Sequence, residues 1–135
     1  MAETKLVKDQ AVEGAQLIEQ LRRNHFDVTD AGWLFDYDSE DWKLYIVSKT
    51  ISDKGRTEAR LELQSAFEQL PDLWMDMSEV RLVDPTDRVA QEIAAIQRRH
   101  PTKLKTRHHV KLGGLSTADV HIYPMPAQTS SVPGN

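Results

Sequence analysis

Residues 33–47 read WLFDYDSEDWKLYIV, and this stretch decides the fold class. Large apolar side chains occupy every second position of both halves: Trp33, Phe35 and Tyr37 in the first, and Trp42, Leu44 and Ile46 in the second. A period of two is typical of β-strands. The polar residues 38–41 between the halves have a length common in hairpin turns. We therefore expect a β-hairpin over residues 31–50. Tyr45 and Val47 predict that its second strand is covered on both faces.

Helical periodicity appears on both sides of this hairpin. Apolar residues spaced three or four apart predict helices over residues 7–24 and 53–70, and a third from Asp84-Pro85 to His100. Pro85 suits the first turn of a helix, where its missing N–H is harmless. Gly55 is a poor helix residue, so the second helix can start later.

Further strands complete the expected architecture. We predict them over residues 79–83, 104–112 and 120–123, with Gly113-Gly114 as a hairpin turn rather than a phosphate-binding loop. The element order is then α-β-β-α-β-α-β-β. This order predicts an α+β protein with a mixed or mainly antiparallel sheet and packed helices, and it leaves the strand order open.

Length and composition fit one folded unit with a short tail. The chain has 135 residues, 39% hydrophobic and 28% charged, as is usual for one globular domain. We expect that domain over residues 1–123 and a flexible Pro/Ser/Gly tail over residues 124–135. The absence of cysteine excludes disulfides, thiolate nucleophiles and Cys-based metal sites. Neither a signal peptide nor a membrane-spanning stretch is visible, so we expect a cytoplasmic protein without a membrane partner.

The charges are unevenly placed along the chain. Residues 1–92 contain 20 of the 21 acidic residues and 11 of the 17 lysines and arginines, a balance of −9. Residues 93–118 contain the other 6 basic residues and no acid, a balance of +6. This basic strip on an acidic chain is the leading candidate for a binding surface.

The basic strip coincides with the strand predicted over residues 104–112. In an extended segment every second side chain shares a face, roughly 7 Å from the next, which is close to the phosphate spacing of an extended nucleic-acid strand. One face of this strand is then apolar and the other basic. The candidate binding residues are Arg98, Arg99, Lys103, Lys105, Arg107, His109 and Lys111.

Three interpretations of the basic face stay open. Its cations can be solvated at a sheet edge, where they discourage pairing with other chains, or lie against acidic residues of the same molecule or a second copy. The face can also bind a protein or another polyanion, or it can bind nucleic acid. It contains no aromatic residue for base stacking, so we rank nucleic acid last.

A second candidate surface lies in residues 70–77, which read LPDLWMDM. Tryptophan and methionine are over-represented at contact surfaces. The candidate partner-binding residues are Leu73, Trp74, Met75 and Met77. The same apolar side chains can instead pack beneath the sheet, and we favour that interpretation.

No motif for catalysis or metal binding is present. His108 and His109 are neighbours on the predicted strand and point to opposite faces, so they cannot hold one ion together. Nothing pairs the carboxylates of the hairpin tip, of the second helix or of Asp72 and Asp76 with a lysine or a strand-borne acid in nuclease-like order. No Gly-x-Ser-x-Gly sequence exists. We therefore assign no catalytic residue, no metal ligand and no cofactor.

Five segments together resemble a group of small bacterial hypothetical proteins of unknown function. They are residues 42–48, 70–74, 95–101, 113–115 and 122–124. The resemblance covers scattered pieces of residues 30–124. It implies a bacterial, free-standing domain and brings no residue role with it.

These observations together predict a small non-enzymatic binding or interaction protein. The expected partner is another protein or a second copy of the chain, acting through the basic strand, the Trp74 region or both. Nucleic acid is a further alternative partner. The alternative function is a metal-dependent hydrolase or nuclease whose site is assembled from distant Asp and His residues.

Overall fold

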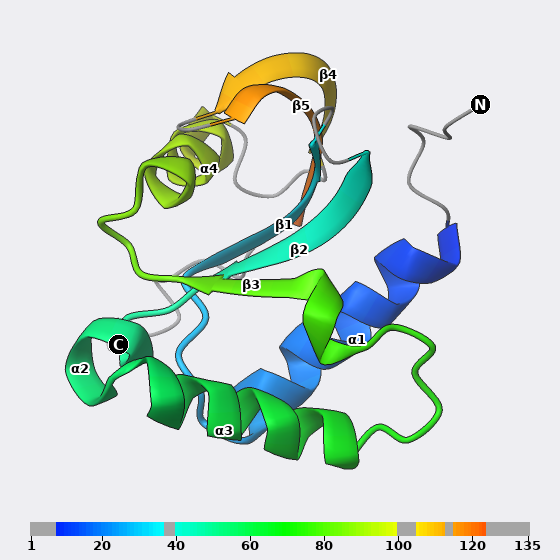
Figure 1. Ribbon diagram of the computed structural model, residues 1–135, viewed down its shortest axis with the longest axis vertical. Coiled ribbons are helices and arrows are strands. Elements are labelled where there is room, and N and C mark those ends of the chain that lie inside the picture. The colour runs from blue at the N-terminus through cyan, green and yellow to red at the C-terminus, as the bar shows by residue number, and fades with distance from the viewer. Residues whose placement is uncertain (1–7, 37–39, 100–104, 113–114, 124–135) are drawn as a thin grey trace, which may run out of the picture.

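The computed structural model describes residues 8–36, 40–99, 105–112 and 115–123 (Figure 1). Its elements are α1 (Lys8–Arg23), β1 (Asp30–Asp36), β2 (Asp41–Val47), α2 (Thr50–Lys54), α3 (Arg56–Glu68), the 3₁₀ helix η1 (Met77–Glu79), β3 (Val80–Val83), α4 (Arg88–Arg99), β4 (Lys105–Leu112) and β5 (Leu115–Ile122). This order confirms the predicted α+β class. The tail predicted over residues 124–135 and the turn at Gly113-Gly114 lie outside the described residues.

The strands form one five-stranded sheet in the order β3-β2-β1-β5-β4. β2 and β3 are parallel, and the other three pairs are antiparallel, so the sheet is mixed. The predicted hairpin is confirmed, with Trp33 opposite Leu44 and Phe35 opposite Trp42. Leu44 and Ile46 of β2 belong to one core cluster and Tyr45 packs against the other, so both faces of this strand are covered, as predicted.

Helices cover both faces of this sheet (Figure 1). On one face α1 and α3 pack against Trp33, Leu44 and Ile46. On the other face α4 packs against Leu34 and two residues of β5. Because Trp33 and Leu34 are neighbours in β1, their side chains point to opposite faces, and each is buried by a different layer of helices.

Two helix boundaries differ from the prediction. The helix predicted over residues 53–70 is two helices, α2 and α3, separated at Gly55, which has a φ of 96°. α4 begins at Arg88 rather than at Pro85. The Asp87 carboxylate accepts the backbone N–H of Val89 at 2.8 Å, so Asp87 caps the helix and Pro85 belongs to the turn before it.

α1 approaches the sheet closely at Gly14. The indole N–H of Trp33 donates to the Tyr123 hydroxyl at 2.9 Å, and that hydroxyl donates to the backbone oxygen of Ala11 at 2.5 Å. A methyl group on Gly14 would lie 2.8 Å from Trp33 Nε1 and overlap the Tyr123 hydroxyl. Burial raises the pKa of Tyr123 to about 12, partly opposed by the hydrogen bond from Trp33. Because Gly14 has no side chain, Trp33 and Tyr123 can pack close to the backbone of α1.

Candidate functional site

Trp74, between α3 and η1, has the most exposed large apolar side chain in the described part of the chain, with 93% of its surface accessible. Met75 beside it is 5% accessible and belongs to the core. Leu73 and Met77 are half-buried and pack against the same core cluster. The predicted core packing is therefore correct for Met75, holds in part for Leu73 and Met77, and is wrong for Trp74.

The backbone beneath Trp74 is held by a carboxylate of α1. Glu13 accepts the backbone N–H of Trp74 at 2.9 and 3.1 Å and that of Met75 at 3.0 Å. Hydrogen bonds to an ionised acceptor are stronger than those between neutral groups. The loop is thus fixed to α1 while the indole ring points away from the core. No sequence signal indicates this role of Glu13, because Trp74 and Met75 follow it by 61 and 62 positions in the chain.

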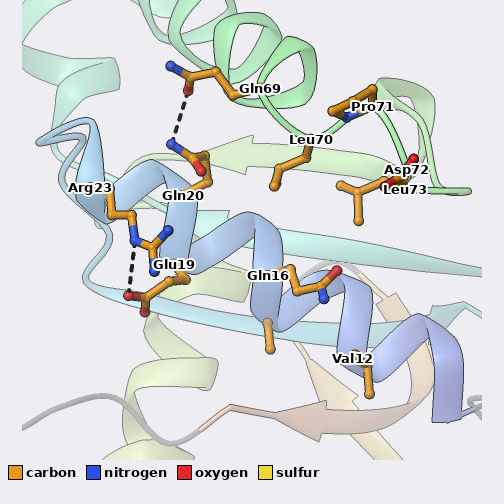
Figure 2. A pocket seen from close by; sticks show the side chains of 11 residues that line it. Val12, Gln16, Glu19, Gln20, Arg23, Gln69, Leu70, Pro71, Asp72 and Leu73 are labelled. Atoms are coloured by element: carbon orange, nitrogen blue, oxygen red, sulfur yellow. Dashed lines mark hydrogen bonds and ion pairs between the residues drawn. The ribbon is translucent and has the colours of Figure 1, made fainter.

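A groove of about 620 Å³ lies between α1 and the loop that follows α3 (Figure 2). Leu70 and Leu73 point from the loop toward α1, and Val12 contributes an exposed apolar side chain from the helix. The lining residues are Val12, Ala15, Gln16, Glu19, Gln20, Arg23, Gln69, Leu70, Pro71, Asp72 and Leu73. An apolar floor with a polar rim suits a peptide side chain or a short helix.

Hydrogen bonds close one end of this groove. Gln69 accepts the side-chain amide of Gln20 at 3.1 Å and that of Asn24 at 2.7 Å. These bonds join the end of α1 to the end of α3. The groove is therefore a gap between two fixed elements.

A smaller acidic hollow of about 300 Å³ lies beside Trp74. Its lining residues are Asp9, Gln10, Glu13, Trp74, Met75 and Glu79. Burial raises the pKa of Glu79, and the Asp76 charge raises it further. Hydrogen bonds from Ser78 lower the pKa of Asp76, so this neighbouring carboxylate stays ionised. The hollow thus concentrates negative charge beside an exposed indole ring.

Trp74, the hollow that it lines and the groove lined by its neighbour Leu73 together form the Trp74 surface. The charge of Lys43 acts on Asp76 and Glu79, and its Nζ lies 3.1 Å from the Ser78 carbonyl and 3.9 Å from Asp41. Arg23, at the rim of the groove, lies 3.6 Å from Glu19. The surface therefore offers an apolar anchor within a field of mainly negative charge.

The predicted basic strand is confirmed as a strand, and β4 occupies an open edge of the sheet. Its pairing with β5 has register shifts between Arg107 and Val110 and between Val110 and Leu112. Such irregularities interrupt the period of two on which the common basic face depends. Lys103 lies outside the described residues, as do the side chains of Arg99, Lys105, Arg107, His109 and Lys111. Their common face stays a prediction.

Arg98 is the candidate of this group whose side chain the structure places. It is exposed at the end of α4, and its charge acts on Asp30 at the start of β1. Burial raises the pKa of Asp30 to about 6, and Arg98 opposes this shift. Arg98 is therefore associated with a half-buried carboxyl of its own chain.

The described residues contain no group of three or more His, Asp or Glu side chains arranged to hold a metal ion. His25 is exposed after α1, with a φ of 64°. His121 contacts Tyr123 edge-to-face, with ring centroids 5.6 Å apart, and burial lowers its pKa.

No protein-family model, curated protein or solved structure matches this chain. Within the ranges that the structure describes, no helix has the length and apolar character needed to cross a bilayer. What the surface can bind therefore follows from its own chemistry.

Proposed function

We propose that this chain is a small non-enzymatic interaction protein that binds a segment of another protein on its Trp74 surface. The observation that carries the proposal is the 93% exposure of a tryptophan whose backbone is fixed by Glu13. Exposing an indole to water is unfavourable, and tryptophan is among the side chains that dominate binding energy at interfaces.

The shape of the surface supports a peptide-like partner. The groove of about 620 Å³ is within the range of volumes that hold a ligand in other proteins. Leu70 and Leu73 expose part of their side chains there next to Val12. One or two apolar side chains of a partner can fill this groove while a neighbouring part of the same partner contacts Trp74.

The charges select the chemistry of that partner. Glu13 and Glu79 line the hollow beside Trp74, and Asp72 lines the groove. A lysine or arginine of the partner can lie over the indole face and pair with these carboxylates. We therefore propose a partner segment that combines apolar residues with at least one cation.

The test is a selection from a display library of random short peptides. Wild-type protein serves as bait, Trp74→Ala serves for counter-selection, and Leu61→Ala is the matched control. Leu61 lies on α3 with 55% of its surface exposed, and it lines neither the groove nor the hollow. We expect the enriched peptides to carry Lys or Arg beside apolar residues, and to lose about tenfold or more in affinity for Trp74→Ala.

Three results would overturn this proposal. In one, no enriched peptide distinguishes wild type from Trp74→Ala. In the second, the enriched peptides are acidic. In the third, sedimentation of the free protein shows self-association that Trp74→Ala abolishes, and the occupant of the surface is then a second copy.

Binding of a polyanion by the basic strand is a second candidate function. The observation in its favour is that β4, which carries four of the seven candidate residues, is an edge strand among the described strands of the sheet. A polyanion can approach this edge without displacing another strand. We expect the charge reversals Lys105→Glu and Lys111→Glu to weaken such binding.

The measurement is fluorescence anisotropy with single-stranded and duplex oligonucleotides at two salt concentrations. Binding through phosphates falls steeply as salt rises. Binding that does not respond to salt, or that both charge reversals leave unchanged, removes this candidate.

The remaining expectations from the sequence are part of the same proposal. We propose a cytoplasmic, bacterial protein, in line with its lack of cysteine and its resemblance to small bacterial proteins. The alternative hydrolase needs two acids and a histidine in one cleft. Neither the groove nor the hollow of the Trp74 surface is lined by that combination.

A further inference from the structure

Among the described strands β3 forms the edge opposite to β4, and it borders a groove with three arginines. Arg56 and Arg60 lie one turn apart on α3, and Arg81 lies on β3 itself. All three are exposed and line a groove of about 440 Å³, where Asp87 is the one acidic lining residue. In the described part of the chain none of the three forms an ion pair within 4.0 Å.

The backbone of β3 is only partly covered along this edge. The Val83 carbonyl accepts the N–H of Ser48, so the groups of Val83 face β2. Because alternate residues of a strand direct their backbone groups to opposite edges, the groups of Leu82 face the open edge. The Arg56 guanidinium donates to the Leu82 carbonyl at 2.9 Å. Arg56 thus supplies the hydrogen bond that a neighbouring strand would otherwise give.

The arginines flank this edge on both faces of the sheet. Arg81 is opposite Tyr45 in the register, and Tyr45 packs with the cluster beneath α4. Arg56 and Arg60 belong to α3, which covers the other face (Figure 1). A strand added beside β3 would place alternate side chains on these two faces, so its acids would meet a guanidinium on either one.

We propose that the β3 edge binds an extended acidic segment of a partner protein as a sixth strand, with Arg56, Arg60 and Arg81 pairing its carboxylates. A backbone N–H of the segment replaces Arg56 at the Leu82 carbonyl, and Arg56 then pairs with the segment. This mode combines main-chain hydrogen bonds with charge complementarity. It is independent of the Trp74 surface, whose proposed partner is cationic.

A purely protective role for these charges is the competing explanation. Charged side chains on an edge strand discourage pairing with other chains, and Arg56 fits that role. Protection predicts that no acidic strand binds. Strand addition predicts binding that depends on both the acids and the backbone N–H groups of the peptide.

The experiment titrates the full chain with a labelled peptide in which pairs of glutamates alternate with single threonines. In an extended conformation this peptide has carboxylates on both faces. One matched peptide replaces each Glu with Lys, and another is N-methylated at every Glu, which removes N–H donors along both of its edges. The variants are Arg60→Glu and Arg81→Glu. The control is Lys49→Glu, an exposed charge reversal outside the groove.

We expect the Glu peptide to bind and to slow hydrogen exchange of the Leu82 amide. Arg60→Glu and Arg81→Glu should each weaken this binding by about tenfold, while Lys49→Glu leaves it within about twofold. The Lys peptide and the N-methylated peptide should not bind.

Four results would overturn the proposal. They are no binding of the Glu peptide, equal binding of the N-methylated peptide, complete competition by inorganic phosphate, and tighter binding of a short oligonucleotide than of the peptide. Trp74→Ala should leave the titration unchanged, so failure here does not affect the function proposed for the Trp74 surface.

Discussion

Trp33 and Trp74 occupy opposite situations in one small protein. Trp33 is fully buried in β1, and its indole N–H donates to the hydroxyl of Tyr123. Trp74 is almost fully exposed, and the protein holds it through backbone N–H groups that Glu13 accepts. The comparison shows that the protein buries and bonds the ring of Trp33, whereas it fixes only the backbone of Trp74 and leaves that ring accessible to a partner.

Replacing each tryptophan by alanine gives the largest contrast. Trp33→Ala removes a buried ring and leaves Tyr123 without a donor, so we expect the free energy of unfolding to fall by about 3–5 kcal/mol. Trp74→Ala removes an exposed ring and should change it by less than about 0.5 kcal/mol. Urea denaturation monitored by circular dichroism measures both. Similar losses in the two variants would show that Trp74 also stabilises the fold, and the comparison would fail.

The close packing of α1 on the sheet at Gly14 allows a second test of the buried tryptophan, Trp33. A methyl group there overlaps Trp33 and Tyr123, and we expect Gly14→Ala to destabilise the protein by about 1–3 kcal/mol. This loss should appear although alanine favours a helix by about 1 kcal/mol over glycine. Gln16→Ala, an exposed change on the same helix, is the control and should not destabilise. A more stable Gly14→Ala would show that α1 can move away from the sheet.

The hydrogen bonds that Glu13 accepts from the loop allow a test of how the exposed tryptophan, Trp74, is held. Glu13→Gln removes the charge that strengthens the bonds to Trp74 and Met75, and we expect a loss of about 1 kcal/mol. Hydrogen exchange of these two amides should become faster, and peptides that depend on Trp74 should bind more weakly. Glu19→Gln, which changes an exposed residue beside the groove, should leave both amides unaffected. Unchanged exchange in Glu13→Gln would mean that the loop is held by other contacts.

Asp30 in β1 and Asp76 near Trp74 predict opposite responses of protein stability to pH. Burial raises the pKa of Asp30 to about 6, so its ionisation opposes folding. Stability should therefore fall as pH rises from about 4 to 6, by about 1 kcal/mol after allowance for solvent screening. Asp76, whose pKa is lowered by Ser78, should act in the other direction, with stability lost as pH falls below its usual pKa. Unfolding of Asp30→Asn should lack the first trend, and a trend that persists would assign it to another group.

Much of the fold follows from residues that are neighbours in the sequence. The alternating apolar residues of 33–47, together with the apolar residues on both faces of β2, predict a central hairpin. The sheet confirms this hairpin, in which Trp33 lies opposite Leu44. Boundaries were less predictable. α4 begins at Arg88 rather than at Pro85, and the Asp87 side chain caps it by accepting the N–H of Val89.

The candidate site was predicted only in part. The composition of residues 70–77 indicates a contact surface or a core segment, and the structure places Trp74 outside and Met75 inside. The reason is Glu13 on α1, which is distant in sequence and fixes the loop backbone. The arginine groove was missed entirely, since Arg56, Arg60 and Arg81 share no spacing that indicates one site.

The sequence by itself determined the α+β class, the hairpin, the acidic chain with its basic strip, and the lack of any cysteine chemistry. These properties depend on local periodicity and on composition, which need no knowledge of distant contacts. Only the tertiary structure decided that Trp74 faces solvent, that three arginines meet at the β3 edge, and that β4 occupies the opposite edge. Each of these depends on which elements pack side by side, and long-range packing is set by the whole core rather than by any single segment.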